Sequence, residues 1–566
     1  EAREGETVLQ AARRAGIDIP HLCSLDWAPS PSASCRLCVV EVEGSPRLQT
    51  SCTLQAREGM VVRTHTPRVT KARRTILELL VANHPQDCLS CRRGGDCELA
   101  RLAADLGVRE RRYVGAVRHH PVDISSPALW RDPDKCVLCG RCVTVCHAVQ
   151  GVGAIDFAGR GFRTRVAPGF SEGLNLSDCV FCGQCARVCP TGAIVERDQV
   201  DDVVAALADP DAVVVAQVAP AVPATLAGDG HGRRGVAAVL RRLSAALARV
   251  GFDAVFDTTF AADLTVVEES NELLARLREG GPLPMFTSCS PAWVNFVEKH
   301  RPDLIPHLST CKSPQQMAAS LIRELYPRTV DLGGRRLVVV SVMPCTAKKA
   351  EALELGDVDV VLTTRELSRL WDRFGIDFAR IDEERPLDPP FAEASGAGRL
   401  FAGSGGVMEA ALRTAYELAT GSGLPGGPVV REARGLEGVR RFAVNTGDTE
   451  LQLAVVNGLG RLREVIDDLL TGDPRLHFVE VMSCPGGCVG GGGQPYDTDA
   501  AAVRERLRRL YRADEEAGRR RSHENEAVQE VYERLLGRPL GEAAHRLLHR
   551  AYRDRSGEAL GVAAGA

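Results

Sequence analysis

Hydrophobic and polar positions follow different patterns before and after about residue 200 of this 566-residue chain. In the first part, VVEVEG (39–44) alternates apolar and charged residues as a half-buried strand does. The segment KARRTILELLVAN (71–83) is amphipathic and predicts a helix with Ile76, Leu79 and Leu80 on one face. After residue 200, apolar strands alternate with amphipathic helices, which predicts an α/β domain.

The composition is that of an ordinary globular protein, 44% hydrophobic and 25% charged. A chain of this length should form several domains, because single cores seldom exceed ~300 residues. The net charge of −4 gives no reason to expect a nucleic acid or an anionic membrane as partner. The best candidate for a membrane span, 212–228, is interrupted by prolines and falls short of ~18 apolar residues. We find no signal peptide and expect a cytoplasmic protein without membrane insertion; because the chain begins at Glu1, we expect that a short N-terminal stretch is missing.

Cysteines supply the candidate chemistry. The chain has 20 of them, and 15 lie before residue 190 in tight groups with two-residue gaps. Disulfide frameworks of that density belong to small secreted chains, so in a large chain we interpret the spacing as metal binding. The four groups are Cys23, Cys35, Cys38 and Cys52; His84, Cys88, Cys91 and Cys97; Cys136, Cys139, Cys142 and Cys146; and Cys179, Cys182, Cys185 and Cys189.

Each group has the ligand count of an iron–sulfur cluster. The first contains one CxxC pair, Cys35 and Cys38, whereas a zinc ribbon needs two matched pairs. The second has three thiols, and the imidazole of His84 can supply the fourth ligand of a [4Fe–4S] cluster, although a lone histidine is more often a capping or core residue. The third and fourth repeat the bacterial run C-x2-C-x2-C-x3-C. Such tandem runs exchange their last cysteines, so Cys189 should complete the third group and Cys146 the fourth.

The remaining cysteines lie in the α/β part: Cys289, Cys311, Cys345, Cys484 and Cys488. The expected strand RRLVVVSVMPC (335–345) delivers Cys345 at its C-terminal end, which is where α/β sheets carry their sites. The glycine run 490–493 lets the backbone approach a bulky ligand without Cβ clashes. These features predict an active site at the edge of the sheet.

The motifs PMFTSCSPAW, SVMPCTAKKAE and EVMSCPGGCVGGGGQP resemble the three signatures of the [FeFe]-hydrogenases, and the cluster groups resemble those of the same family and of complex-I-type large subunits. The resemblance implies a multidomain α+β and α/β chain. Its expected parts are a β-grasp [2Fe–2S] domain at 1–67, a His/Cys3 [4Fe–4S] domain at 68–118, a bacterial two-[4Fe–4S] ferredoxin domain at 119–198, an α/β catalytic domain at 199–500 and a short helical, small-subunit-like tail at 501–566. One [2Fe–2S] and three accessory [4Fe–4S] clusters would carry electrons one at a time.

The active site of that family is the H-cluster, a [4Fe–4S] cubane joined by a cysteine to a diiron unit that bears CO, cyanide and an azadithiolate. By motif position the resemblance assigns the cubane to Cys345, Cys484 and Cys488, with Cys488 as the bridge. It gives Lys348 a hydrogen bond to a cyanide and pairs it with Glu351. The rest of the pocket is expected from Met343, Met482, Pro314, Gln315, residues 218–222 and the loop and helix that begin at residue 403.

Hydrogen chemistry also needs a path for protons. The family builds it from a cysteine, two glutamates, a serine and an arginine, and these positions fall on Cys289, Glu269, Glu272, Ser309 and Arg276. Glu269, Glu272 and Arg276 have helical spacing on or near one face. A solvated charged face is the ordinary interpretation of such a row, but beside these motifs we prefer the proton path.

Two positions depart from the family pattern, and the first of them falls on a ligand. The family has Cys-Cys where this chain has Cys289 and Ser290, and the second cysteine is the fourth cubane ligand. Cys311 stands where a small residue such as alanine is expected, and by motif position it faces the same pocket. Three hypotheses follow: Ser290 binds iron as an alkoxide, Cys289 becomes the ligand, or Cys311 does. Because thiolate is the better ligand for iron–sulfur clusters, we favour a cysteine over Ser290.

The sequence therefore predicts an enzyme that converts protons and electrons reversibly into H2. One alternative is the electron-input subunit of a complex-I-like or formate dehydrogenase assembly, which would lack the three later motifs. Others are a hydrogen sensor, which would use the same site, and a non-catalytic iron–sulfur assembly relative, which would lack Lys348.

The expected partners follow from the same resemblance. The segment SGAGRLFAGSGG (395–406) lacks the strand and helix context of a dinucleotide fingerprint, so NAD(P)H must act through a partner subunit that carries flavin or iron–sulfur clusters. Ferredoxin is the simpler electron partner. Hydrogenase maturation proteins must install the diiron unit.

Overall fold

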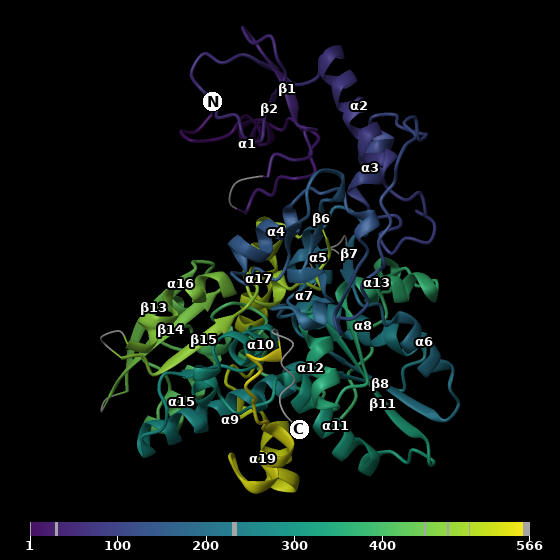
Figure 1. Cartoon of the computed structure of the whole chain (residues 1–566). Helices are drawn as coiled ribbons and strands as arrows, with labels where there is room; N and C mark the ends of the chain where they lie inside the picture. The colour runs from purple at the N-terminus through teal and green to yellow at the C-terminus, as the bar shows by residue number, and fades with distance from the viewer. Residues whose placement is uncertain are drawn as a thin grey trace. The chain divides into compact units, whose positions relative to one another are not determined.

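The structure, a computed structural model, describes residues 2–28, 32–228, 235–446, 449–471, 475–496 and 498–558 (Figure 1). The chain folds into two compact units. Unit 1 consists of Glu1–Cys179 and Gln184–Arg197, and unit 2 of Val180–Gly183 and Asp198–Ala566. Most of the cysteine groups therefore lie in unit 1, and the last five cysteines lie in unit 2.

Unit 1 is built from short elements. Its helices are α1 (Val8–Arg14), α2 (Pro67–Ala82), α3 (Glu98–Asp105), α4 (Arg141–Thr144) and α5 (Gln184–Val188). Its strands are β1 (Val39–Val42), β2 (Gln49–Thr50), β3 (Val62–Arg63), β4 (Leu129–Arg131), β5 (Asp156–Ala158), β6 (Arg165–Ala167) and β7 (Ile194–Glu196). They pair antiparallel as a three-stranded sheet β2-β1-β3 and two two-stranded sheets, β4-β7 and β5-β6.

The strand predicted at 39–44 and the helix predicted at 71–83 are both present, as β1 and α2. The predicted face of α2 is wrong at Leu79, which is 56% exposed, whereas Ile76 and Leu80 are partly buried against the core of this unit. Val69, Arg73 and Leu77 are fully buried instead. Their spacing of four residues makes a continuous stripe along the helix, and the guanidinium of Arg73 donates to Val39 O of β1 at 2.9 Å.

Unit 2 contains two four-stranded sheets. The first is wholly parallel, in the order β12 (Val360–Thr363), β11 (Arg336–Met343), β8 (Ala212–Val218) and β9 (Ala254–Asp257). The second has the order β10 (Met285–Phe286), β15 (Phe478–Met482), β14 (Glu450–Asn457) and β13 (Val439–Asn445), and only β13 runs antiparallel to its neighbour. The α/β prediction for this part is confirmed.

Helices cover both sheets. They are α6 (Val200–Ala208), α7 (Ala221–Leu226), α8 (Val236–Val250), α9 (Thr258–Glu279), α10 (Pro291–His300), α11 (Pro314–Thr329), α12 (Ala347–Leu355), α13 (Thr364–Arg373), α14 (Gly396–Leu400), α15 (Gly406–Thr420), α16 (Leu459–Thr471), α17 (Ala500–Glu515), α18 (Glu526–Val531) and α19 (Glu542–Leu548). Figure 1 shows α15 and α16 on opposite sides of the second sheet. Every residue of β8 is buried, as expected for a parallel strand covered on both faces.

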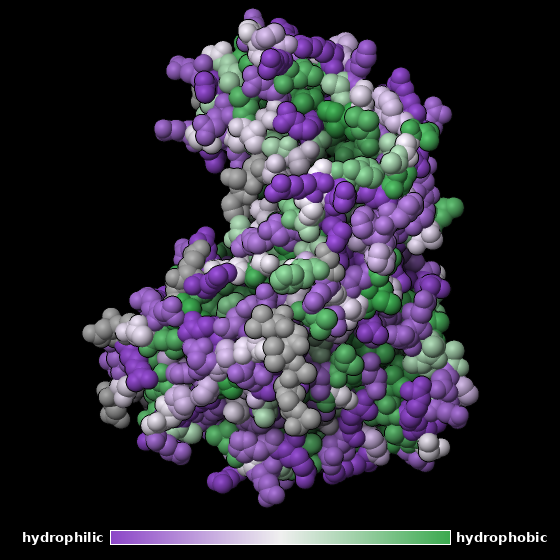
Figure 2. Space-filling view, in the orientation of Figure 1, coloured by the Kyte–Doolittle hydropathy of each residue, from purple (hydrophilic) through white to green (hydrophobic). Residues whose placement is uncertain are grey.

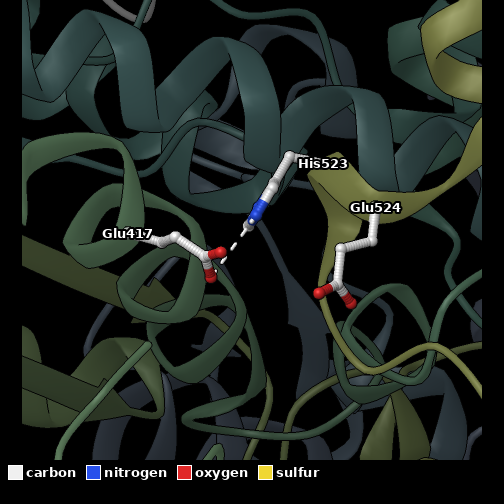
Figure 3. Close-up of side chains that lie close together, drawn as sticks. All are labelled: Glu417, His523 and Glu524. Atoms are coloured by element: carbon white, nitrogen blue, oxygen red, sulfur yellow. Dashed lines mark ion pairs between the residues drawn. The ribbon is translucent and has the colours of Figure 1, made fainter. Parts of the chain in front are cut away.

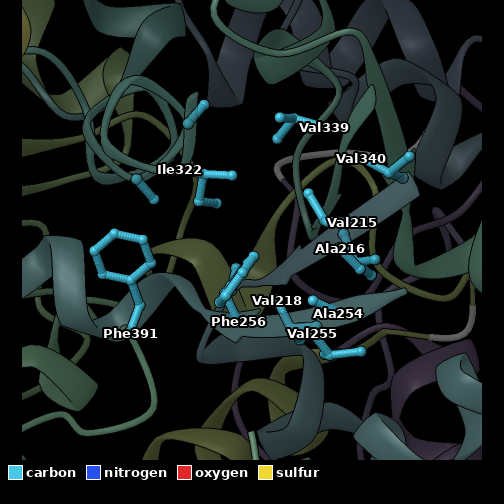
Figure 4. Packing of buried hydrophobic residues seen from close by; sticks show 14 of the residues in the cluster. Val215, Ala216, Val218, Ala254, Val255, Phe256, Ile322, Val339, Val340 and Phe391 are labelled. Atoms are coloured by element: carbon cyan, nitrogen blue, oxygen red, sulfur yellow. The ribbon is translucent and has the colours of Figure 1, made fainter. Parts of the chain in front are cut away.

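The core of unit 2 lies against the first sheet. Val215 and Val339 from β8 and β11 are fully buried and belong to the cluster drawn in Figure 4. The ring of Phe256 contacts Phe391 edge-on, with centroids 5.6 Å apart. This packing makes the strands rigid, so the residues that follow their carboxyl ends are held in place.

The face drawn in Figure 2 is mainly hydrophilic, with hydrophobic side chains in scattered groups. Among the described residues, no helix has the length and apolar character needed to cross a membrane.

Candidate active site and cluster sites

Strands from both sheets of unit 2 end at one cavity. Cys345 follows β11 by two residues, and Cys484 follows β15 by two residues. Cys289 lies between β10 and α10, three residues after the last residue of β10. Because carboxyl ends of parallel strands meet at one edge, cysteines that are up to 195 positions apart in the sequence come together there.

The cavity has a volume of about 90 Å³, several times the ~10–15 Å³ that one water needs. The expected pocket residues that line it are Cys289, Ser290, Pro314, Gln315, Met343, Cys345, Lys348, Met482, Cys484 and Cys488. Ala219, Pro220 and Ala221, from the expected segment 218–222, line it too. The wall expected from residue 403 onward is formed instead by the two preceding residues, Phe401 and Ala402.

Lys348 supplies a positive charge at this cavity. Its Nζ donates to Glu351 Oε2 at 2.9 Å and to Cys289 O at 3.3 Å. Glu351 also accepts hydrogen bonds from Ser313 Oγ at 2.9 Å and from Gln315 Nε2 at 3.2 Å. The carboxylate is thus held by three donors, and it fixes the lysine at the cavity wall.

The cavity thiols are poorly placed to ionise without a cation. Burial raises the pKa of Cys345 to about 12 and that of Cys488 to about 11, and it raises the pKa of Cys289 well above its usual value. Lys348 opposes the shift at all three cysteines. A bound metal cluster would favour the thiolates far more strongly, and soft sulfur donors are the ligands that iron–sulfur clusters select. The donors present therefore fit an iron–sulfur group.

The glycine run allows close backbone approach next to the cavity. A Cβ at Gly491, which lines the cavity, would lie 2.2 Å from Pro344 O. A Cβ at Gly490 would lie 2.1 Å from Pro485 O. Side chains at these positions would push apart the segments that carry Cys345 and Cys484.

The two positions that depart from the family pattern lie in different places. Ser290 lines the cavity, and its Oγ lies 2.8 Å from Ser483 Oγ. Cys311 is fully buried in the core of unit 2 and, among the described residues, is outside the set that lines the cavity. The expectation that Cys311 faces this pocket is wrong, because its segment is turned toward helix α9 and the carboxylates of Glu268, Glu269 and Glu272.

The residues expected to carry protons form a buried row. Glu269 is fully buried and Glu272 is 8% exposed, so the alternative of a solvated face does not hold. Ser309 Oγ donates to Glu272 Oε2 at 2.9 Å, and Arg276 binds Glu272 Oε1 at 2.6 Å. Burial, with the nearby charge of Glu272, raises the pKa of Glu269 to about 8, and hydrogen bonds from Ser288 and Ser309 oppose this shift.

The inner end of the row meets the cavity. Ser288 N donates to Glu269 Oε1 at 3.5 Å, and the next residue, Cys289, lines the cavity. At the other end Arg276 donates to the carbonyls of Pro306, His307 and Leu308. The row therefore extends from the cavity to the C-terminal part of α9.

In unit 1 a second cavity brings together cysteines from two groups. Cys136, Cys139, Cys142 and Cys189 line it, so the last cysteine of the fourth group lies with the first three of the third. Cys146 lies near Cys179 and Cys185, since the charges of Cys146 and Cys179 both raise the pKa of Cys185. Leu138, between Cys136 and Cys139, has φ of 53°. A left-handed leucine is sterically costly, and such backbone is typical of functional sites.

The first cysteine group is a compact cluster of four buried thiols. Cys23 shares hydrogen bonds with Cys35 and Cys52, and Cys38 shares one with Cys52. These bonds lower the pKa of Cys38 to about 6 and raise that of Cys52. Four buried sulfurs linked by these contacts are suited to binding two iron atoms.

The His84 ring is oriented as a metal ligand would be. Its Nδ1 lies 2.7 Å from Pro85 O, while Nε2 is buried without a hydrogen-bond partner among the described atoms. Burial lowers the pKa of His84, which favours the neutral ring. A neutral imidazole with one nitrogen bonded to a carbonyl and the other open is the usual state of a ligating histidine. The site fits a cluster in which His84 joins Cys88, Cys91 and Cys97.

Glu417, His523 and Glu524 form another grouping with metal-ligand chemistry (Figure 3). His523 Nε2 lies 3.5 Å from Glu417 Oε2. The guanidinium of Arg521 lies 3.1 Å from Glu417 and 2.6 Å from Glu524. The arginine already supplies a cation to both carboxylates, so we interpret this grouping as a surface ion-pair cluster.

Sequence reasoning missed several buried polar residues around the site. Glu480 of β15 accepts Gly405 N at 2.6 Å and Met408 N at 2.7 Å, and burial raises its pKa to about 7. Lys349 binds Glu366 at 2.9 Å, and both are buried. The only signal for them in the sequence was a charged residue inside an apolar strand or beside a motif, which by itself does not name a partner.

Five family descriptions match consecutive parts of the chain. They are a 2Fe-2S iron-sulfur cluster binding domain (1–67), the NADH-ubiquinone oxidoreductase-G iron-sulfur binding region (73–112), a 4Fe-4S dicluster domain (134–193), the iron only hydrogenase large subunit, C-terminal domain (212–492), and the iron hydrogenase small subunit (500–555).

Similar proteins agree with these matches. The chain is 47% identical to the NADP-reducing hydrogenase subunit HndD of Solidesulfovibrio fructosivorans, over 98% of this chain and 97% of that protein. It is 37% identical to iron hydrogenase 1 of Clostridium pasteurianum, over 97% of each. Among solved structures, an apo [FeFe]-hydrogenase from Chlamydomonas reinhardtii matches with a TM-score of 0.55 and 40% identity, covering 63% of this chain and 99% of that one. The chain belongs to the iron-only, or [FeFe], hydrogenase family, whose members are oxidoreductases that act on H2.

Proposed function

We propose that this chain interconverts H2 with two protons and two electrons at the cavity of unit 2. One observation carries the proposal: the cavity combines cysteines from three strand ends with Lys348 and with the inner end of a buried carboxylate row. Soft donors for a redox group and a proton path from the same cavity are the two things that this reaction requires.

The cavity residues fit the H-cluster of the family. Cys345, Cys484 and Cys488 would bind the cubane, with Cys488 bridging to the diiron unit. When bound, this group supplies the electron transfer and an open iron position for H2. Lys348, fixed by Glu351, would donate a hydrogen bond to an anionic ligand of the diiron unit. Met343 and Met482 would provide a soft apolar wall.

The segment of Cys289 and Ser290 has two roles to fill, the fourth cubane ligand and the first proton carrier beside Glu269. Both residues line the cavity, and Cys311 does not. We assign the ligand role to the sulfur of Cys289, because iron–sulfur clusters select thiolate, and the hydroxyl of Ser290 is then the remaining proton carrier. If the iron content of the cubane falls in Ser290→Ala and is kept in Cys289→Ala, the two roles are reversed.

Protons would move between the cavity and the surface through Glu269, Ser309 and Glu272, with Arg276 at the outer end. The pKa of about 8 keeps Glu269 mostly protonated at neutral pH, so it can donate without first gaining a proton from solvent. Ser309 can accept on one side and donate on the other, because a hydroxyl does both.

Unit 1 would carry the electrons. We assign one [2Fe–2S] cluster to Cys23, Cys35, Cys38 and Cys52 and one [4Fe–4S] cluster to His84, Cys88, Cys91 and Cys97. Two further [4Fe–4S] clusters are assigned to the third and fourth groups with Cys189 and Cys146 exchanged. The similarity to the NADP-reducing HndD supports an NADP-linked partner subunit as one electron partner and ferredoxin as another. Maturation proteins would load the diiron unit.

The test is H2 evolution from reduced methyl viologen under anaerobic conditions, after full cluster reconstitution and loading of the diiron unit. We expect turnover, together with infrared bands of bound CO and cyanide. Loaded protein that shows these bands and no turnover would contradict the enzymatic proposal. The chain alone should reduce ferredoxin with H2 and should not reduce NADP+, since its sequence offers no convincing nucleotide site.

A further inference from the structure

The segment Ser309–Lys312, here called the relay loop, is paired with residues 548–552 of the tail, shown in yellow in Figure 1. Arg550 N donates to Thr310 O at 2.8 Å, and Lys312 N donates to Leu548 O at 2.7 Å. Cys311 and His549 form the antiparallel bridge between these two bonds. The tail thus adds a short strand to the loop that carries Ser309.

Two side chains of the tail reinforce this pairing. Tyr552 Oη donates to Ser309 O at 2.6 Å. His549 Nδ1 lies 2.8 Å from Thr310 Oγ1. Both contacts reach the relay loop at or next to the serine that is bonded to Glu272.

The peptide units of the relay loop connect the tail to the proton row. In the unit between Ser309 and Thr310, the carbonyl accepts from Tyr552, and the N–H donates to Glu272 Oε2 at 3.1 Å. In the next unit the carbonyl of Thr310 accepts from Arg550 N, and the N–H of Cys311 donates to Ser309 Oγ at 3.2 Å. A hydrogen bond to a peptide carbonyl orients and polarises the N–H of the same unit.

The tail is itself anchored on the helix of the proton row. Glu268, adjacent to Glu269 in α9, is fully buried. It receives Tyr532 Oη at 2.5 Å and Leu540 N at 2.9 Å, and its Oε2 lies 3.1 Å from His549 Nε2. His549 therefore joins α9 to the relay loop, with one ring nitrogen on each.

We propose that His549 and Tyr552 are positioning residues for proton transfer, which hold the relay loop so that the Ser309 hydroxyl stays bonded to Glu272 in the proton row. The inference rests on the proposed function, because it concerns the same proton row. Among the described residues neither lines the cavity, so both act through the residues that they hold in place. Displacement of a bridging group by ~1 Å can slow a reaction about 100-fold. Loss of one contact to the relay loop should displace the Ser309 hydroxyl by less than this distance and slow the reaction less.

The test uses the full-length, loaded protein with Tyr552→Phe, and with Tyr511→Phe as the matched control. Tyr511 belongs to the same tail and contacts Arg434, away from the relay loop. We expect Tyr552→Phe to lower H2 evolution about 3- to 10-fold and to raise its solvent isotope effect, since proton transfer becomes slower. The CO and cyanide infrared bands should be unchanged, and Tyr511→Phe should leave rate and isotope effect as in the unaltered protein.

Two substitutions of His549 separate its two contacts. The amide nitrogen of asparagine can occupy the position of Nδ1, which contacts Thr310. The amide nitrogen of glutamine can reach the position of Nε2, which contacts Glu268. His549→Asn should keep the Thr310 contact and most of the rate, and His549→Gln should keep the Glu268 contact and lose rate with a raised isotope effect. Equal isotope effects in His549→Gln, Tyr552→Phe and the unaltered protein would overturn the proposal.

A readout without turnover keeps the inference separate from the proposed function. The infrared C=O stretch of a protonated carboxyl shifts when its hydrogen bonds change, so the Glu269 band should move in Tyr552→Phe and stay in Tyr511→Phe. If loaded protein never evolves H2, the proposed function fails, and the band still decides the positioning role. An unshifted band in Tyr552→Phe would contradict it.

Discussion

Lys348 and Lys349 are neighbours in the sequence and have different roles. Lys348 points to the cavity, whereas Lys349 is 4% exposed and binds Glu366 Oε1 at 2.9 Å and Gln199 Oε1 at 3.1 Å. Glu366 also holds Thr363 N and Gln199 N, so it joins α13 to the start of α6. Motif position singled out the first lysine, and only burial reveals the second.

Lys349→Met should therefore destabilise unit 2. It leaves the fully buried Glu366 without its cation, which costs about 3–5 kcal/mol for a buried pair. The measurement is the midpoint of denaturant unfolding, with Lys71→Met on the exposed face of α2 as control. A variant as stable as the control would show that the pair contributes nothing.

Glu269 should make both catalysis and stability depend on pH. Its pKa of about 8 in the folded chain exceeds the value of 4.5 expected when unfolded. Between these values the folded state keeps a proton that the unfolded state releases, so stability falls as pH rises from about 4.5 and levels off above about 8. Below pH 4.5 both states are protonated, so this group no longer makes the stability depend on pH.

Glu269→Gln should remove this part of the pH dependence and lower H2 evolution at least ~100-fold, the usual contribution of a positioned acid or base. The measurements are unfolding midpoints from pH 5 to about 8 and the rate with reduced methyl viologen. Some pH dependence should remain, because Glu480 titrates near pH 7 in the folded chain. An unchanged rate would exclude Glu269 from the proton path.

At the scale of elements, the site depends on how strands end. β11 and β15 each deliver a cysteine two residues after their last paired residue, and the glycine run packs between them. Apolar runs in the sequence predicted the first of these strands. The partner strands could not be predicted, because the order within a sheet is set by contacts between segments far apart in the chain.

Gly491→Ala should disrupt this junction. The added Cβ would lie 2.2 Å from Pro344 O, next to Cys345, and relief of such overlap costs about 1–3 kcal/mol. We expect a lower unfolding midpoint and less iron in the cubane after reconstitution. Gly518→Ala is the control, because a Cβ there meets nothing within 4 Å.

For helices too, the local sequence predicts the element, whereas segments far away in the chain decide which face is buried. The spacing of Glu269, Glu272 and Arg276 gave their common helix and side. Whether that side meets solvent or the core depends on residues that follow it by more than thirty positions, such as Ser309 and Thr310. In α2 the apolar pattern gave the helix and missed the buried stripe, because the buried Arg73 looks polar in sequence.

At the scale of the whole molecule, the two units differ in what holds them together. In unit 1 the small hydrophobic clusters include the cysteines themselves, with Cys23, Cys35 and Cys139 in one and Cys38 and Cys52 in another. Unit 2 has a large core of aliphatic and aromatic residues on its parallel sheet. Metal binding and folding should therefore be coupled strongly in unit 1.

Calorimetry of the metal-free protein should show two transitions, with unit 1 unfolding at the lower temperature. Reconstitution with iron and sulfide should raise the first transition much more than the second, because the bound clusters stabilise only the folded state. Cys38→Ala should abolish most of that increase for the segment around β1. A single transition that is insensitive to iron would contradict this coupling.

The pairing of the relay loop with the tail also means that the two segments are translated at different times. Thr310 and His549 are 239 positions apart. A ribosome that adds ~5–20 residues per second delivers the tail strand roughly 12 to 48 s after the loop. Throughout that interval the carbonyls of Ser309 and Thr310 lack these partners and must bond to water instead. The contacts that hold the relay loop are complete only after residue 552 has been translated.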